Sequence, residues 1–241
     1  PVLSRGLGDV YKRQMMNREA YEGVTDLSDF ETVMYGIEPD NYYLIATSEH
    51  PLTAMRMDEV IEPNELPVKL VGVSPCFRRE VGAHGLSDRG IWRVHQFTKI
   101  EQIVICHPDD SWGHHEELLQ NAVDLWDSLG LHYRVVNICT GDMGTVAAKK
   151  YDLEAWLPGA GSYKEVVSCS NCTDYQANRL RMRYRTKEGN ESVHTLNSTA
   201  VATSRALVAI MEQNQLKDGR VRVPEVLRPY MGEKEILESL K

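Results

Sequence analysis

Hydrophobic residues gather into six short runs along the chain, and turn-forming residues bound each run. Several of the runs contain β-branched and aromatic side chains, which are typical of strands. They cover residues 42–47, 68–73, 92–106, 133–138, 165–168 and 193–197. A loop that contains Gly82, Gly85 and Gly90 separates the second run from the third. This arrangement predicts a long antiparallel hairpin.

Residues 110–129 show a different spacing, because their apolar side chains recur every three or four positions, as on one face of a helix. The recurring residues are Leu118, Leu119, Ala122, Val123, Trp126 and Leu129. Ser111 is a candidate N-cap and Gly130 a candidate C-cap for this helix. A second helix is expected over 206–213. Together the runs and helices predict an α+β fold with a mainly antiparallel sheet.

The composition is that of a globular protein and excludes intrinsic disorder as the main state. The 241 residues are 42% hydrophobic and 26% charged, and 27 basic against 35 acidic residues give a net charge of −8. We find no run of roughly 18 apolar residues and no secretory signal. Five cysteines without framework spacing favour reduced thiols. We therefore expect a cytoplasmic protein that meets any nucleic acid through a local patch.

The residues with the most distinctive chemistry flank the predicted hairpin turn. Arg78 and Glu80 alternate along one predicted strand, and the next carries Arg93, His95, Phe97, Lys99 and Glu101 at alternate positions. Alternation places the side chains of each set on one face of the sheet. An arginine binds a phosphate bidentately, an aromatic ring stacks on a base, and a carboxylate holds an amine or a hydroxyl. These residue types suit a nucleotide together with an amino acid, and the alternative is a solvated strand face with ordinary ion pairs.

Three further patterns leave alternatives open. Cys169 and Cys172 form a CxxC pair, read as structural thiols in preference to metal ligands because no second pair follows at zinc-ribbon spacing. His114 and His115 begin the long helix and are expected on a solvated face. Four alternating arginines form either a solvated edge or a phosphate-facing stripe. They are Arg179, Arg181, Arg183 and Arg185.

Four segments, in order, resemble the seryl-tRNA synthetase family of class II aminoacyl-tRNA synthetases. Residues 77–80 (FRRE) resemble motif 2, and 44–53 (LIATSEHPLT) resemble the serine-recognition segment. Residues 168–176 (SCSNCTDYQ) resemble the segment beside ATP, and 194–205 with 223–231 resemble motif 3 and the C-terminus. With Thr199 and Ala200, this last segment resembles the archaeal and eukaryotic branch of the family more than the bacterial one. Four motifs in register are more specific than FRxE alone.

The resemblance implies a class II synthetase fold with six to seven strands flanked by helices. It also implies ATP-dependent activation of L-serine to seryl-adenylate and transfer to the 3′ end of tRNA(Ser). The catalytic residues would be Arg78, Arg205 and Glu165. Arg78 would bind both the α-phosphate and the serine carboxylate, which stabilises charge in the transition state.

The resemblance also assigns the two substrates. Glu80 would contact the adenine edge, Phe97 would stack on the ring, and Arg205 would lie on its other face or near the γ-phosphate. The ATP residues implied are Arg78, Arg79, Glu80, Val94, Phe97, Glu165, Val166, Val167, Ser168 and Arg205, with Glu165 and Ser168 holding Mg²⁺. The serine residues implied are Thr47, Ser48, Glu49, Arg78, Glu101, Asn197 and Thr199. Which glutamate binds the amine and which the hydroxyl stays open.

Small residues precede the motif 3 arginine at positions where many class II sequences have glycine. They are Ala200, Ala202 and Ser204. Their size allows a nucleotide to approach the backbone closely. The alternative is plain packing at a junction between a strand and a helix.

The domain expectation is a non-native leader over 1–14 and the synthetase catalytic domain over 15–241. Motif 1 and the N-terminal tRNA-binding arm are not found before Met15. The expected partners are serine, ATP and tRNA(Ser), with a homodimer for the full-length protein and no membrane. Two alternatives stay open: a ligase that loads an amino acid onto another carrier, and a catalytically silent paralogue that binds tRNA or protein.

Overall fold

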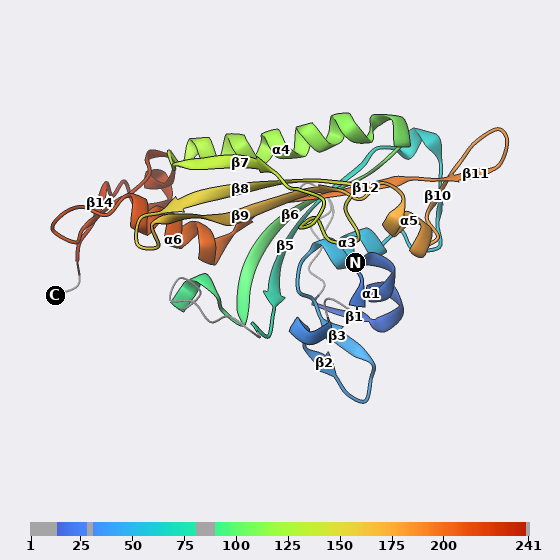
Figure 1. Cartoon of the computed structure of the whole chain (residues 1–241), viewed down its shortest axis with the longest axis horizontal. Coiled ribbons are helices and arrows are strands. Elements are labelled where there is room, and N and C mark those ends of the chain that lie inside the picture. The colour runs from blue at the N-terminus through green and yellow to red at the C-terminus, as the bar shows by residue number, and fades with distance from the viewer. Residues whose placement is uncertain (1–13, 28–30, 81–89, 240–241) are drawn as a thin grey trace.

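A six-stranded sheet forms the centre of the molecule (Figure 1). The computed structural model describes residues 14–27, 31–80 and 90–239. Every neighbouring pair of strands in this sheet is antiparallel. In spatial order the strands are β5 (Val68–Phe77), β6 (Gln96–Cys106), β12 (His194–Ala202), β9 (Ser162–Asn171), β8 (Lys149–Leu157) and β7 (Tyr133–Asn137). The predicted α+β fold with a mainly antiparallel sheet is confirmed.

Helix α4 (Ser111–Ser128) lies along one face of the sheet (Figure 1). Its buried Trp126 packs in a core cluster that also contains Leu153 and Val167. The helix matches the predicted range, but Ser111 is its first residue and Asp110 is the N-cap, so the Ser111 cap was wrong. The Ser111 hydroxyl instead donates to the carbonyl of Pro108 at 2.9 Å, which closes the preceding turn.

The other helices are shorter and lie away from α4. Helix α6 follows β12 directly and starts three residues before its predicted range, while α1 and α3 occupy the opposite side of the sheet from α4 (Figure 1). Short helices of this kind depend on tertiary packing more than on their own propensity. Their bounds are α1 (Arg18–Val24), α3 (Glu49–Ala54), α5 (Tyr175–Arg179) and α6 (Thr203–Gln213).

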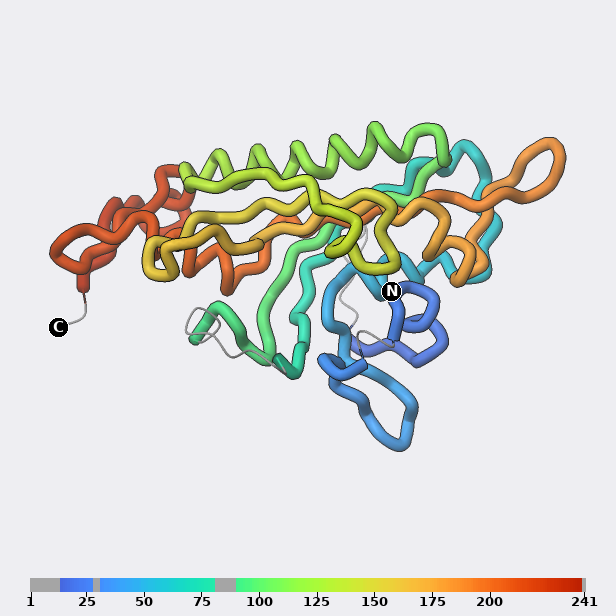
Figure 2. Tube along the Cα trace, in the orientation of Figure 1, coloured from blue at the N-terminus to red at the C-terminus, as the bar shows by residue number. Residues whose placement is uncertain are grey.

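The predicted hairpin of β5 and β6 is present, but the bounds of its strands differ from the predicted runs. Strand β5 continues past residue 73 to Phe77. Strand β6 starts at Gln96, because residues 90–92 form a 3-10 turn in which Gly90 has a φ of +66°. The end of β5 and the start of β6 extend away from the other strands (Figure 2). Arg78 and Glu80 therefore follow β5 at this projecting end and are not part of the strand.

Strand β8 was missed by the sequence analysis. It shows the period of two expected of a strand, since Leu153, Ala155 and Leu157 are buried and Asp152 and Glu154 lie on the other face. Its charged residues broke the run of apolar letters that identified the other strands. The predicted 165–168 segment belongs to the longer β9, and residues 194–197 of the predicted 193–197 segment belong to the longer β12.

Three small sheets complete the structure. They comprise β1 (Met15–Asn17), β3 (Tyr42–Leu44) and β2 (Gly36–Ile37); β11 (Asn190–Ser192), β10 (Arg183–Arg185) and β4 (Val60–Ile61); and β13 (Val221–Arg222) with β14 (Ile236–Leu237). The arginines around β10 favour the solvated edge: Arg181 pairs with Asp58, and Arg185 pairs with Glu62 at 2.8 Å. Within the described ranges, no helix has both the length and the hydropathy needed to cross a bilayer.

Candidate active site

A cavity of about 380 Å³ opens on the side of the sheet that carries α1 and α3. Its walls come from residues far apart in the chain, including the segment after α1, strands β6, β9 and β12, and the start of α6. Most of the predicted site residues line it. These are Thr47, Glu49, Arg78, Glu80, Val94, Phe97, Glu101, Glu165, Val166, Ser168, Asn197, Thr199 and Arg205.

Three predicted residues do not line the cavity. Ser48 is buried beneath it, beside Gly72 of β5. The Arg79 guanidinium lies over the ring of Tyr35, 5.8 Å from its centroid. Val167 is buried in the core cluster that contains Trp126.

Strand register aligns three positions at one end of the cavity. Gly72 of β5 pairs with Glu101 of β6, and Glu101 pairs with Thr199 of β12. Gly72 has a packing role, because a Cβ there would lie 2.7 Å from Leu52 Cδ1 and 2.8 Å from Ser48 Cβ. The missing side chain lets α3 approach the sheet, and α3 begins with Glu49. Gly72 therefore allows the Glu49 carboxylate to lie near the Glu101 carboxylate.

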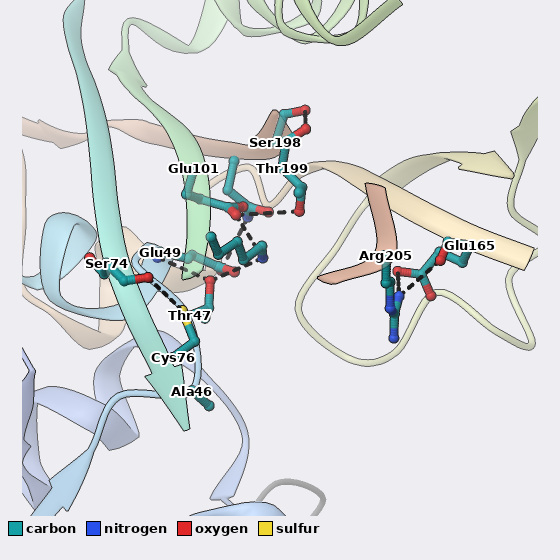
Figure 3. A network of polar contacts seen from close by, with 12 residues as sticks. Ala46, Thr47, Glu49, Ser74, Cys76, Glu101, Glu165, Ser198, Thr199 and Arg205 are labelled. Carbon is teal, nitrogen blue, oxygen red and sulfur yellow. Dashed lines mark hydrogen bonds and ion pairs between the residues drawn. The ribbon is translucent and has the colours of Figure 1, made fainter. Parts of the chain in front are cut away.

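Thr47, Glu101 and Thr199 lie close together at this end (Figure 3), and Lys99 joins them. Its Nζ lies 2.6 Å from Glu101 Oε2 and donates to Thr47 Oγ1 at 3.2 Å. Thr199 Oγ1 donates to Glu101 Oε2 at 3.3 Å. Burial raises the pKa of Glu101, although the Lys99 ammonium acts in the opposite direction. Glu101 is thus already paired with a cation inside the protein.

Glu49 has a different environment, since two neutral amides hold it. Gln176 Nε2 and Asn197 Nδ2 donate to Glu49 Oε1 at 2.9 Å and 3.1 Å. Burial, followed by the nearby charge of Glu101, raises the pKa of Glu49 to about 7. Asn197 lines the cavity as predicted, and the structure places its amide against Glu49 and, at 3.6 Å, the sulfur of Cys172.

The other end of the cavity contains guanidinium groups and aromatic rings. Arg78 Cζ lies 5.5 Å from the centroid of Phe97, and Arg205 Cζ lies 5.3 Å from that of Trp92. Arg205 donates to the backbone carbonyl of Glu165 at 2.9 Å and lies 3.5 Å from its Oε1, apart from the Glu101 group (Figure 3). Arginines beside flat aromatic faces suit a nucleotide.

Two irregularities in the strands shape this end. The register of β9 shifts between its pairing of Val167 with Leu153 and of Glu165 with Glu154, which leaves Val166 as an extra residue. In a regular strand, residues three apart lie on opposite faces, but one extra residue returns Glu165 to the face of Ser168. A second shift, at Ala200 of β12, precedes Ala202 and Ser204, and both of these line the cavity.

Several residues of the cavity wall had no predicted role in the site. They are Val24, Thr25, Asp26, His50, Trp92, Lys99, Met143, Gly144, Thr145, Val146, Ala147, Lys150, Ser170 and Cys172. Lys99 could have been assigned to the site from the sequence, because it alternates with Phe97 and Glu101 on β6. Residues 143–147 form a connection without regular secondary structure, so no periodicity marks them.

The two cysteines of the CxxC pair are separate buried thiols. Cys169 Sγ donates to the carbonyl of His115 at 3.7 Å, and burial raises the pKa of both thiols. His115 is buried as well, with Nε2 3.1 Å from the carbonyl of Cys169 and its ring stacked on Tyr151, so the expected solvated face was wrong for this residue. Among the described residues, no group of three or more histidine, cysteine or acidic side chains is arranged to hold a metal ion.

Comparison with known proteins gives consistent similarities. The family model described as the tRNA synthetase class II core domain (G, H, P, S and T) matches residues 32–214. A protein from Methanospirillum hungatei named serine–tRNA ligase is 62% identical over 239 residues, which cover 98% of this chain and 56% of that protein. The chain therefore spans little more than half the length of the curated relatives it matches.

Solved structures show the same similarity. A crystal structure of seryl-tRNA synthetase from Pyrococcus horikoshii complexed with ATP has a TM-score of 0.92 and 51% identity, covering 97% of this chain and 53% of that one. A cytoplasmic serine–tRNA ligase from Naegleria fowleri in complex with AMP has a TM-score of 0.90 and 46% identity, covering 96% and 56%.

Proposed function

We propose a function from the premise that this chain belongs to the tRNA synthetase class II core domain family. The chain carries the catalytic core of a serine–tRNA ligase, which uses ATP to activate L-serine and then transfers the seryl group to the 3′ end of tRNA(Ser). One observation carries the proposal: two carboxylates, Glu49 and Glu101, share a cavity with two arginines, Arg78 and Arg205. Such a cavity complements an amino acid at one end and a nucleotide at the other.

The charges at the amino-acid end favour one orientation of serine. Glu101 already pairs with the Lys99 ammonium at 2.6 Å, whereas the hydrogen bonds given to Glu49 come from neutral amides. A second ammonium on Glu101 would lie beside a like charge, so the serine ammonium binds Glu49. The serine hydroxyl then bonds to Glu101 and Thr199, which lie opposite each other on β6 and β12.

This orientation explains how serine is selected. Alanine lacks the hydroxyl and would leave buried polar groups of Glu101 and Thr199 without a partner, which is costly. Threonine adds a methyl group to a pocket already bounded by the Thr199 side chain, itself 4% exposed. Thr47 contributes to serine binding indirectly, because its hydroxyl accepts a hydrogen bond from the Lys99 ammonium.

Arg78 links the two ends of the cavity. Its Nε donates to the carbonyl of Ala46 at 3.2 Å, which fixes the direction of the guanidinium. The other N–H groups remain for the serine carboxylate and the α-phosphate. In the activation step a carboxylate oxygen attacks the α-phosphorus, the bond to the leaving pyrophosphate breaks, and Arg78 stabilises the charge that accumulates between them.

Adenine binds at the arginine and aromatic end. Phe97 offers a ring for stacking, and the Arg205 guanidinium, held by the Glu165 carbonyl, covers the opposite face. Val94 gives an apolar wall. Glu80 presents a carboxylate oriented by Arg93 at 2.8 Å, which suits the exocyclic amine of adenine. Arg79 acts from outside the cavity by supporting this segment against Tyr35.

The acidic and hydroxyl oxygens at the β9 irregularity fit Mg²⁺. Glu165 and Ser168 lie on one face, and the neighbouring Asp152 has a buried Oδ1 without a hydrogen-bond partner. Oxygen ligands, with phosphates and water completing the shell, are what Mg²⁺ requires. Glu165 and Ser168 would hold the ion, which would supply positive charge to neutralise the phosphates. Val166 and Val167 supply the backbone that sets this pair on one face.

The remaining assignments concern the whole protein. The chain spans about half the length of the relatives it matches. We propose that tRNA(Ser) accepts the seryl group when its terminal 3′-hydroxyl attacks the adenylate carbonyl and AMP leaves. We also propose that the full-length protein is a cytoplasmic homodimer. A catalytic core domain over 15–241 completes the proposal.

The test is serine-dependent exchange of labelled pyrophosphate into ATP by this chain. Alanine, threonine, glycine and cysteine serve as controls, and circular dichroism verifies folding. Exchange with serine alone supports the proposal, and addition of tRNA(Ser) transcript then separates transfer to tRNA from loading of another carrier. A folded chain that binds ATP and gives no exchange with serine would overturn it in favour of a silent paralogue.

A further inference from the structure

Gln176 of α5 is buried behind the amino-acid end of the cavity and does not line it. Its side chain is 1% exposed, and its carboxamide forms three hydrogen bonds. Nε2 donates to the carbonyl of Val24 at 3.0 Å and to Glu49 Oε1 at 2.9 Å. The Thr195 hydroxyl donates to Oε1 of Gln176 at 2.6 Å. The amide therefore connects the end of α1, the first residue of α3 and strand β12.

The chemistry of these partners fixes the orientation of the amide. The Val24 carbonyl only accepts hydrogen bonds, so the NH₂ group must face it. The Glu49 carboxylate likewise accepts, which uses the second N–H. Thr195 then occupies the carbonyl side. A flipped amide would place an oxygen against two acceptors, so a single orientation satisfies all three neighbours.

The same contacts determine how Glu49 faces the cavity. Gln176 and Asn197 both donate to Oε1. With Oε1 engaged by two amides, Oε2 is the oxygen available to a ligand in the cavity that Glu49 lines. Asn197 also lines the cavity and approaches Glu49 from the ligand side, whereas Gln176 holds it from behind.

We propose that Gln176 is a positioning residue for the amino-acid substrate, because it orients the Glu49 carboxylate toward the substrate ammonium and ties it to the end of α1. The inference rests on the proposed function, which assigns the ammonium to Glu49. Gln176 does not touch the substrate, so its effect reaches serine through Glu49 and leaves the nucleotide end unchanged.

The chain offers a matched control for the test. Gln213 also uses its amide for three hydrogen bonds: it accepts from the N–H of His132 at 2.6 Å and donates to the carbonyls of His132 and Trp156 at 2.9 Å and 2.8 Å. It lies at the end of α6 and does not line the cavity. Gln213→Met therefore measures the loss of a hydrogen-bonded glutamine without any link to Glu49.

The experiment compares KM for serine with KM for ATP in the pyrophosphate exchange of the whole chain. Methionine keeps the length of glutamine and removes its hydrogen bonds. Gln176→Met is expected to raise KM for serine at least about tenfold, the effect of one hydrogen bond to a charged group. KM for ATP should change less than about twofold, and Gln213→Met should leave the ratio of the two constants unchanged. Unchanged KM for serine, or an equal rise in both constants, would overturn the proposal.

A second pair of variants decides the matter if Gln176→Met does not fold. Thr195→Val removes the hydroxyl that holds the Gln176 carbonyl, and Thr195→Ser retains it. Valine should raise KM for serine about threefold over the serine variant, and equal constants in the two would overturn the proposal. Serine-dependent exchange by the unsubstituted chain distinguishes a failure of this inference from a failure of the proposed function.

Discussion

The two ends of the cavity differ in how they are prepared for a ligand. At the amino-acid end, Glu101 is 1% exposed and is neutralised by Lys99 within the protein. At the nucleotide end, Glu165 keeps 46% of its side chain exposed, and its contact with Arg205 is longer, at 3.5 Å. Electrostatic interactions are stronger in the buried region. Under the proposed function, the buried end would discriminate between similar small substrates, and the open end would bind phosphates and release pyrophosphate.

The largest expected effect concerns the residue that joins both ends. Arg78→Ala should reduce serine-dependent pyrophosphate exchange by about 10³-fold, since the guanidinium stabilises charge in the transition state. The fold should persist, because Arg78 is only half-buried and lies beyond the end of β5. Exchange assays and circular dichroism measure the two quantities. Unchanged exchange in a folded variant would contradict the assignment of motif 2.

The buried carboxylate pair gives the next largest effect. Glu101→Gln should lower kcat/KM for serine by about 100-fold, because it replaces a charged acceptor that holds the hydroxyl and leaves Lys99 without its ion pair. KM for ATP should change less than about threefold. Parallel titrations of serine and ATP in the exchange assay separate the effect on serine use from the effect on ATP binding. Equal losses would assign Glu101 to the nucleotide or to the fold.

The pH dependence of serine use tests the other carboxylate. The pKa of Glu49 is about 7, so Glu49 is neutral below this pH and attracts the serine ammonium only weakly. We expect kcat/KM for serine to fall about tenfold between pH 8 and pH 6 and to level off above pH 8, as a free-enzyme group should behave. Burial lowers the pKa of the nearby His50 to about 3, which excludes it as the source.

Glu49→Gln provides the control for that profile. The variant should show a lower and pH-independent kcat/KM for serine over the same range, because the amide does not titrate. Lys99, Arg78 and Glu101 also act on this carboxylate, and they remain in the variant. An inflection near pH 7 that survives the substitution would assign the titration to another group.

The two ends of the cavity also differ in how much of their geometry the sequence predicts. Two apolar runs on either side of a glycine-containing loop predicted the hairpin of β5 and β6, and apolar positions recurring every three or four residues predicted helix α4. Alternation also placed Phe97 and Glu101 on one face. The positions of Glu165 and Ser168 depend on the extra residue Val166, and a strand pattern without that irregularity places them on opposite faces.

The amino-acid end depends on packing that the sequence does not reveal. Glu49 reaches Glu101 because Gly72 admits α3, and Gln176 reaches Glu49 because α5 lies against α1. Helices of five to seven residues have little intrinsic stability, so their positions follow from tertiary contacts. The motifs identified which residues carry the chemistry, and the short helices determine which of them meet.

The smallest expected effect tests how closely the buried end fits its substrate. Thr199→Ser retains the hydroxyl that donates to Glu101 and removes one methyl group, so kcat/KM for serine should change less than about threefold. The added space should raise kcat/KM for threonine about tenfold, the lower range for one methyl in a pocket. Thr203→Ser is the matched control, since Thr203 bonds to the carbonyl of Thr98 and does not line the cavity. The ratio of serine to threonine exchange is the measured quantity. An unchanged ratio would mean that the methyl of Thr199 does not exclude threonine and that discrimination lies in the Glu101 side of the pocket.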